Sequence, residues 1–107
     1  MATVAPNWLN PPQEKWIGCS IQGRMDPNEY AVQLQVNGSE VAVAIPRAFV
    51  KAPAILPSEG GLRVVVVAYL PNDRALAELP AAPLNGTRRI NVGVARLMDD
   101  WNAVIRS

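Results

Sequence analysis

The chain has 107 residues, of which 50% are hydrophobic and 6% aromatic, and its ten basic and nine acidic residues leave a formal net charge of +1. This length fits one domain with one core, and the near-neutral charge excludes an overall field that would hold a polyanion or a membrane surface. The single cysteine, Cys19, excludes an intrachain disulfide and fits a reducing compartment, so we expect a cytoplasmic protein without a membrane partner.

The first predicted element is an extended arm at residues 1–14, in which prolines at positions 6, 11 and 12 disfavour a helix. Trp8 in this arm is expected to dock on its own domain or on a neighbouring copy, because an exposed indole lowers solubility. Residues 15–23 then predict a strand whose inward residues alternate along the chain, and residues 23–28 predict a turn. The inward residues are Ile17, Cys19 and Ile21.

Residues 29–46 give the clearest prediction, a β-hairpin with a fixed register. Asn37 and Gly38 suit the two left-handed positions of a type I′ turn, and apolar residues alternate on both sides of it. A two-residue turn sets the pairing, and a slip by one residue would expose half of the apolar side chains. The expected pairs are Leu34 with Val41, Val32 with Val43, and Tyr30 with Ile45.

After Pro46, residues 47–52 predict a short helical plug of one or two turns that stops at Pro53. Residues 57–61 predict a loop. Residues 62–70 are apolar on both faces and therefore predict a central strand. A turn at residues 71–74 and a short strand at residues 75–79 follow, before a second loop.

The last predicted strand covers residues 88–97, and Gly93 within it suggests a bulge. Residues 98–107 predict a short C-terminal helix, capped by Asp99 or Asp100, that packs on the open end of the sheet. Its apolar stripe consists of Leu97, Trp101, Val104 and Ile105.

These elements predict a mainly β protein, a small antiparallel β-barrel or tight β-sandwich of about five to six strands, as in oligonucleotide-binding and SH3-like folds. The expected organisation is an extended arm at residues 1–14, a barrel domain at residues 15–97 and a helical segment at residues 98–107. No internal repeat is visible in the sequence.

The residue types argue against an enzyme. The chain has no histidine and one cysteine, so the commonest general base is missing, and we expect no metal and no cofactor. Asp99 and Asp100 are adjacent and would point apart, which favours helix capping over metal binding. Gly60 and Gly61 precede a strand, whereas phosphate-binding loops run from a strand into a helix.

One local pattern resembles a known family. A strand ending Ile45-Pro46-Arg47, a short helical stretch, Gly60-Gly61 and the strand from Leu62 are similar to the swapped-hairpin DNA-binding domains of AbrB- and MazE-type antitoxins and regulators. The resemblance covers roughly 25 residues, lacks the acidic residue after the glycine, and implies DNA binding as an alternative function.

Our first functional expectation is a non-catalytic binding or assembly module that forms a homo-oligomer. The outward residues of the hairpin make a flat, nearly uncharged face that suits a protein contact, either with a twin or with the C-terminal segment of the same chain. The expected interface consists of Ala31, Gln33, Gln35, Ala42, Ala44 and Trp8.

The alternative function is binding of single-stranded nucleic acid by a small barrel. It would use arginines on the last strand, which converge only if the strand ends protrude past the core or a bulge at Gly93 rotates part of that strand. The candidate residues are Arg88, Arg89 and Arg96.

Overall fold

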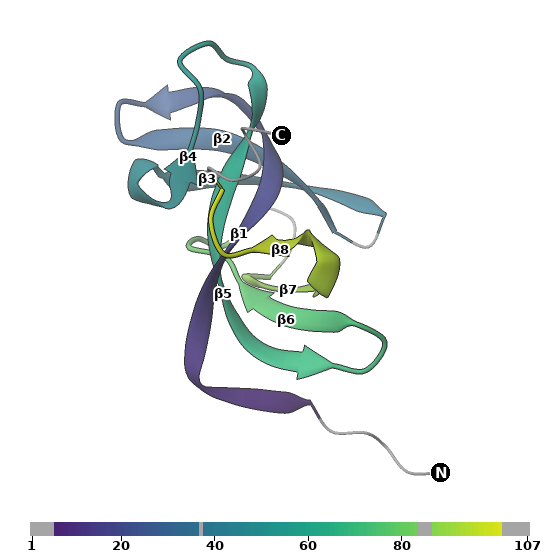
Figure 1. Cartoon of the computed structure of the whole chain (residues 1–107). Helices are drawn as coiled ribbons and strands as arrows, with labels where there is room; N and C mark the ends of the chain where they lie inside the picture. Colours follow the sequence, from purple (N-terminus) through teal and green to yellow (C-terminus); the bar gives the residue numbers. More distant parts are fainter. Residues whose placement is uncertain (1–5, 37, 84–86, 102–107) are drawn as a thin grey trace.

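The computed structural model describes residues 6–36, 38–83 and 87–101. The strands form one antiparallel sheet in the order β3-β2-β1-β5-β6-β7, in which β4 also pairs with β5 and β8 with β1 (Figure 1). The elements are β1 (Asn7–Asp26), β2 (Glu29–Val36), β3 (Ser39–Pro46), the 3₁₀ turn η1 (Arg47–Phe49), β4 (Val50–Lys51), β5 (Ser58–Leu70), β6 (Arg74–Glu78), β7 (Arg89–Gly93), the 3₁₀ turn η2 (Val94–Arg96) and β8 (Leu97–Met98).

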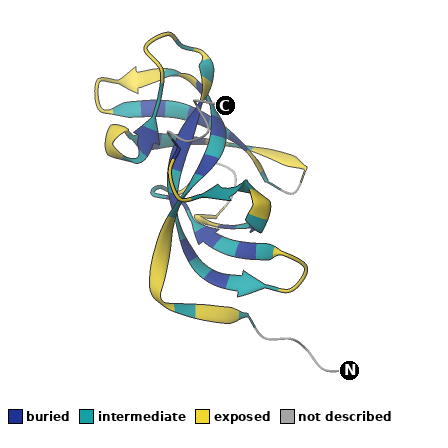
Figure 2. Ribbon diagram, in the orientation of Figure 1, coloured by how far each residue is buried: buried dark blue, intermediate teal, exposed yellow. Residues whose placement is uncertain are grey.

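The sheet curls into a half-barrel around one apolar core. Alternate residues of the strands are buried, as expected for strands with one face inward (Figure 2). The closed barrel or sandwich predicted from the sequence is not formed, because β3 and β7 end the sheet path without pairing with each other. The β character and the antiparallel pairing are confirmed.

The two halves of the chain follow the same path. We call β1 to β4 with η1 the first half, and β5 to β8 with η2 the second half. In each half a long strand pairs with a hairpin, the hairpin ends in a 3₁₀ turn, and a two-residue strand then pairs with the long strand of the other half. The short strands β4 and β8 are thus exchanged between the halves. The antiparallel pair Ile17–Leu62 lies at the centre of this arrangement, which has an approximate two-fold axis there.

Details of the pairing agree between the halves. The β1–β2 ladder shifts register between Ile21 and Gly23, and the β5–β6 ladder shifts at the corresponding place, between Val66 and Ala68. The N–H of Arg47 donates to the carbonyl of Asn28 at 2.6 Å before η1, and the N–H of Val94 donates to that of Asp73 at 2.8 Å before η2. The chain therefore contains a structural repeat that its sequence does not show.

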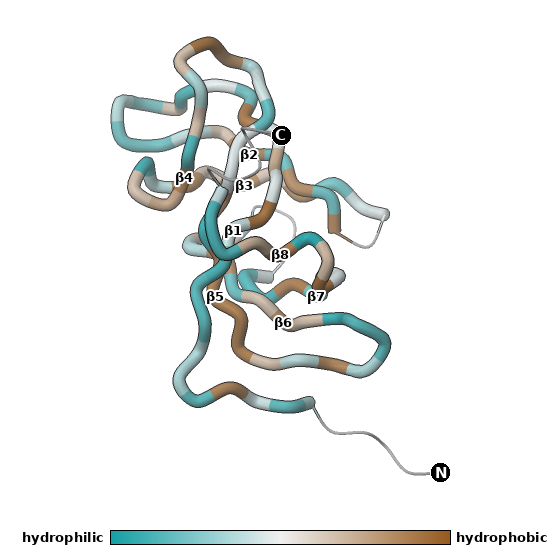
Figure 3. The backbone as a smooth tube through the Cα atoms, in the orientation of Figure 1, coloured by the Kyte–Doolittle hydropathy of each residue, from teal (hydrophilic) through white to brown (hydrophobic). Residues whose placement is uncertain are grey.

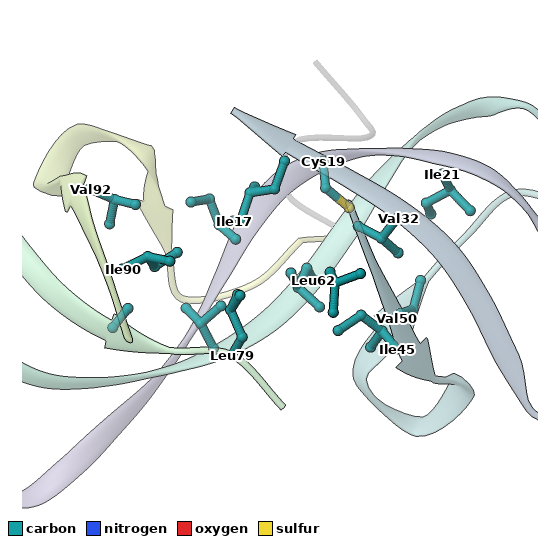
Figure 4. Packing of buried hydrophobic residues seen from close by; sticks show 14 of the residues in the cluster. Ile17, Cys19, Ile21, Val32, Ile45, Val50, Leu62, Leu79, Ile90 and Val92 are labelled. Atoms are coloured by element: carbon teal, nitrogen blue, oxygen red, sulfur yellow. The ribbon is translucent and has the colours of Figure 1, made fainter. Parts of the chain in front are cut away.

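The core is continuous across the two-fold axis. Figure 4 shows Ile17 and Leu62 between the apolar side chains of the two halves. All of these side chains are buried, with Ile17 and Leu62 at 0% exposure. The flanking residues are Val32, Ile45 and Val50 in the first half, and Leu79, Ile90 and Val92 in the second.

The predicted hairpin is confirmed in register. All three expected pairs occur, Leu34 with Val41, Val32 with Val43 and Tyr30 with Ile45. Gly38 has φ +79°, as a type I′ turn requires, while Asn37 lies outside the described residues.

The prediction of a helical plug at residues 47–52 is wrong. Residues 47–49 form a single 3₁₀ turn, and Val50 and Lys51 extend to pair with Leu62 and Gly61 of β5. The backbone groups that a helix would have used are taken by this pairing.

The C-terminal helix is also not seen. Leu97 and Met98 form strand β8 on the edge of β1, and no helix begins by residue 101; residues 102–107, with Val104 and Ile105, lie outside the described residues. A short helix is marginal in water, whereas the edge of β1 offers partners for the backbone.

Other boundaries differ from the prediction. Strand β1 begins at Asn7, so residues 7–14 of the predicted arm belong to the sheet, as a largely hydrophilic stretch in Figure 3. Strand β5 begins at Ser58 and includes the predicted loop glycines. The expected bulge at Gly93 is wrong, because β7 ends there without a register shift and continues into η2.

The chain after β8 crosses the outer side of the β1–β5 pair, where Trp101 is buried at 7% exposure. Its indole lies over Gly18 and Gly61, which face each other in the ladder. Two glycines opposite each other leave a flat patch of backbone that accepts a large ring.

Candidate binding surface

The five predicted hairpin residues lie together on the outer side of β2 and β3. Their neighbours Val32, Leu34 and Val43 point into the core, so alternation directs these five outward. The register places Ala31 opposite Ala44, Gln33 opposite Ala42 and Gln35 opposite Glu40. We call Ala31, Gln33, Gln35, Ala42 and Ala44 the hairpin face.

A shallow hollow of about 540 Å³ lies over the alanine part of the hairpin face. Met25, at 62% exposure, borders it, as do Gln22 and Ala82. No charged side chain lines this hollow among the residues that the structure describes. An apolar, uncharged hollow bordered by an exposed methionine is typical of a protein contact.

The second half carries a different surface at the same place. In the paired ladders, Gln33 and Ala42 correspond to Glu78 and Arg89. Arg89 Nη2 donates to Glu78 Oε2 at 2.8 Å. The position of Ala44 is taken by Asn91, whose side-chain oxygen accepts from Arg74 Nε at 2.8 Å. The second half therefore has a charged face with internal partners where the first half has a small, neutral one.

The glutamine end of the hairpin face adjoins a second, polar hollow of about 410 Å³. Arg96, on η2, donates from Nη1 to the carbonyl of Gln35 at 2.6 Å, and Gln35 also donates to Glu40 at 3.2 Å. Partial burial, and then the charge of Arg74, lower the pKa of Arg96 from its ordinary value. This end of the face therefore already makes contacts within the chain.

Trp8 does not join the hairpin face. It pairs with Ala68 near the end of β5, in the second half of the sheet, whereas β2 pairs with the opposite end of β1. Its side chain is 55% exposed, and the guanidinium carbon of Arg89 lies 5.5 Å from its ring centre. Trp8 is thus stacked on a residue of the second half.

The three arginines of the nucleic-acid alternative have separate partners. Arg88 Nε donates to the carbonyl of Leu79 at 3.1 Å, Arg89 pairs with Glu78, and Arg96 bonds Gln35. Each of the three lines a different hollow. The bulge at Gly93 that would bring Arg89 and Arg96 to one face does not occur.

Cys19 is buried beside Gly60, with its Sγ 3.6 Å from the carbonyl oxygen of Gly60. Burial, and to a lesser extent the charge of Glu59, raise the pKa of this thiol to about 12. A thiol with such a pKa is protonated at neutral pH and is a poor nucleophile.

Within residues 6–36, 38–83 and 87–101, no three His, Cys, Asp or Glu side chains are placed to hold one metal ion. In the same ranges, no helix has the length and apolar character needed to cross a membrane. Comparisons with protein-family models, with curated proteins and with solved structures find no match.

Sequence reasoning missed several features of this surface. Met25 and Ala82 come from segments predicted as a turn and a loop. In the structure Met25 belongs to β1, which pairs with β2, and Ala82 lines the same hollow. The contrast with the second half depends on the repeat, which has no sequence signal. The alternation of Ala and Gln in β2 and β3 is the signal that did locate the face.

Proposed function

We propose that this protein is a non-catalytic assembly module that associates with a second copy of itself through the hairpin face. The observation that carries the proposal is the contrast between the two halves at corresponding positions. A surface strand position usually carries a polar or charged side chain, as Glu78 and Arg89 do in the second half. At the same positions in the first half, neither Gln33 nor Ala42 is charged, and Ala42 is also small.

A second copy suits this face because an isologous contact brings each residue against its own surface. A face with like charges at the two-fold axis would repel itself, whereas Ala and Gln do not. The alanine methyl groups let two backbones approach closely.

The test is the mass of the protein in solution, measured by light scattering over a range of concentrations. We expect a dimer for the natural sequence and a monomer for Ala42→Lys, because the added charge would be desolvated next to its own copy. Asn91→Lys is the control, since it adds the same charge to the charged face of the second half, and it should leave the dimer intact.

A natural sequence that stays monomeric at every concentration would overturn the proposal. So would a dimer that Asn91→Lys disrupts as strongly as Ala42→Lys does.

A further inference from the structure

The outer edge of β3 carries backbone groups with which no strand of the described sheet pairs. Hydrogen-bonded pairs alternate along an antiparallel ladder, and the bond from Arg47 to Asn28 fixes the alternation between β2 and β3. Tyr30–Ile45 and Val32–Val43 are therefore hydrogen-bonded pairs. It follows that Glu40, Ala42 and Ala44 direct their N–H and C=O groups away from β2. In the sheet as described, no strand pairs with this edge.

Side chains occupy two backbone carbonyls on the corresponding edge of β7. The bond from the N–H of Leu79 to the carbonyl of Arg88 fixes the same alternation there, so Arg89 and Asn91 face the free edge. Thr87 Oγ1 donates to the carbonyl of Arg89 at 2.8 Å, and Arg74 Nη2 donates to that of Asn91 at 3.1 Å.

Within the described part of the chain, no side chain protects the edge of β3 in this way. Ala42 and Ala44, which correspond to Arg89 and Asn91, receive no side-chain hydrogen bond among the described residues. An open edge of this kind is a template for another strand, and proteins that avoid such pairing block their edges.

We propose that β3 pairs in antiparallel fashion with β3 of a second copy, in a register centred on Ala42. This inference rests on the proposed self-association and specifies its geometry, edge to edge between two sheets. In such a dimer the two β3 strands would pair across a two-fold axis, as β1 and β5 pair across the axis at Ile17–Leu62 within the chain.

The register follows from the groups available. With Ala42 opposite its own copy, Glu40 lies opposite Ala44, all the free N–H and C=O groups of these three residues are paired, and the two Glu40 side chains stay apart. A register centred on Val43 places Glu40 opposite Pro46, which has no N–H to donate. A register centred on Val41 leaves Ala44 beyond the other β3.

This register predicts that substitutions of opposite charge at position 44 change the dimerisation affinity in opposite directions. Ala44→Lys places a cation opposite Glu40 of the second copy, and Ala44→Glu places a second carboxylate there. Because the pair occurs twice in a two-fold dimer, we expect Ala44→Lys to tighten dimerisation by roughly 2- to 30-fold and Ala44→Glu to weaken it by a similar factor. Sedimentation equilibrium measures both constants, and circular dichroism checks that each variant is folded.

Hydrogen exchange gives a second measure that needs no substitution. Edge pairing protects the amide protons of Ala42 and Ala44 as the protein concentration rises, and leaves those of Arg89 and Asn91 unchanged.

Some outcomes separate this inference from the proposed function. If the natural sequence dimerises but Ala44→Lys and Ala44→Glu weaken the dimer equally, the hairpin faces stack on each other and the edge pairing is wrong. Fast exchange of Ala42 and Ala44 amides in the dimer leads to the same conclusion. A natural sequence that is always monomeric overturns both proposals.

Discussion

Trp101 packs directly on the backbone of Gly61. A Cβ atom on Gly61 would lie 2.6 Å from the indole Cγ, closer than any side chain allows. Gly18, opposite Gly61 in the ladder, lies under the other end of the ring, where a Cβ atom would be 3.4 Å from Cη2. The segment after β8 is thus held to the sheet by a ring on two glycines, of which Gly61 has the tighter contact.

This difference in contact distance predicts that alanine substitutions at Gly61 and Gly18 have unequal effects on stability. Gly61→Ala should lower the free energy of unfolding by about 1–3 kcal/mol, since the methyl group must displace the indole. Gly18→Ala should change it much less, because its methyl group meets the ring near ordinary contact distance. Urea denaturation of both variants measures the two values.

Removing the indole provides the control. In a Trp101→Ala background the cost of Gly61→Ala should largely vanish, because the two residues are in contact and their effects are not additive. A cost that persists there would show that Gly61 is constrained by something other than Trp101.

The two-fold repeat predicts that corresponding core residues contribute similar amounts to the free energy of unfolding. Leu34 and Leu79 occupy the same position in the two halves and are each 1% exposed. Each replacement by alanine should lower the free energy of unfolding by about 2–5 kcal/mol. A variant at Leu79 that costs far less than its partner at Leu34 would argue against one continuous core.

The buried thiol of Cys19 predicts a loss of stability in alkali. Below the ordinary thiol pKa of 9.0, the folded and unfolded chains are both protonated at this site. Between there and the folded pKa of about 12, only the unfolded chain releases the proton, so stability falls as pH rises, with a limiting slope of about 1.4 kcal/mol per pH unit.

The comparison for this prediction is Cys19→Ala. Its free energy of unfolding, followed from pH 8 to pH 11 by chemical denaturation, should fall less steeply than that of the natural sequence. The Lys15–Asp99 ion pair, which raises the pKa of Lys15, is present in both proteins and cancels. Equal slopes would mean that Cys19 ionises as freely in the folded chain as in the unfolded one.

The separate partners of Arg88, Arg89 and Arg96 predict weak or absent binding of nucleic acid. We expect no measurable affinity for a single-stranded oligonucleotide in fluorescence anisotropy, even at low ionic strength. Binding that weakens with salt, with a slope of about −0.7 per phosphate, and that disappears in Arg89→Ala/Arg96→Ala, would instead favour the nucleic-acid alternative.

The hairpin could be predicted from sequence because its turn and its alternation both specify one register. The short 3₁₀ turn after Pro46 and the separate strand β8 could not, because local pattern favours a helix after Pro46, and one continuous strand followed by a helix at the C-terminal end. Pairing with distant residues determines the conformation of these segments, since β4 and β8 pair with strands from the opposite half.

The repeat leaves little trace in residue identity. Leu34 and Leu79 are identical, but most corresponding positions share only burial or direction, as Tyr30 and Ala75 do in the core. Five of the six expected interface residues share one face because alternation within a hairpin is local. The sixth, Trp8, is placed by the sheet as a whole.

The exchange of β4 and β8 between the halves also orders events during synthesis. The hairpin of β2 and β3 closes over a few residues and can form soon after it leaves the ribosome. Trp16, however, finds its partner Met98 only when almost all of the described chain has been made. Until then the backbone of Trp16 and Ile17 that pairs with β8 has no strand partner. The nascent chain therefore passes through a stage in which this edge of β1 is exposed.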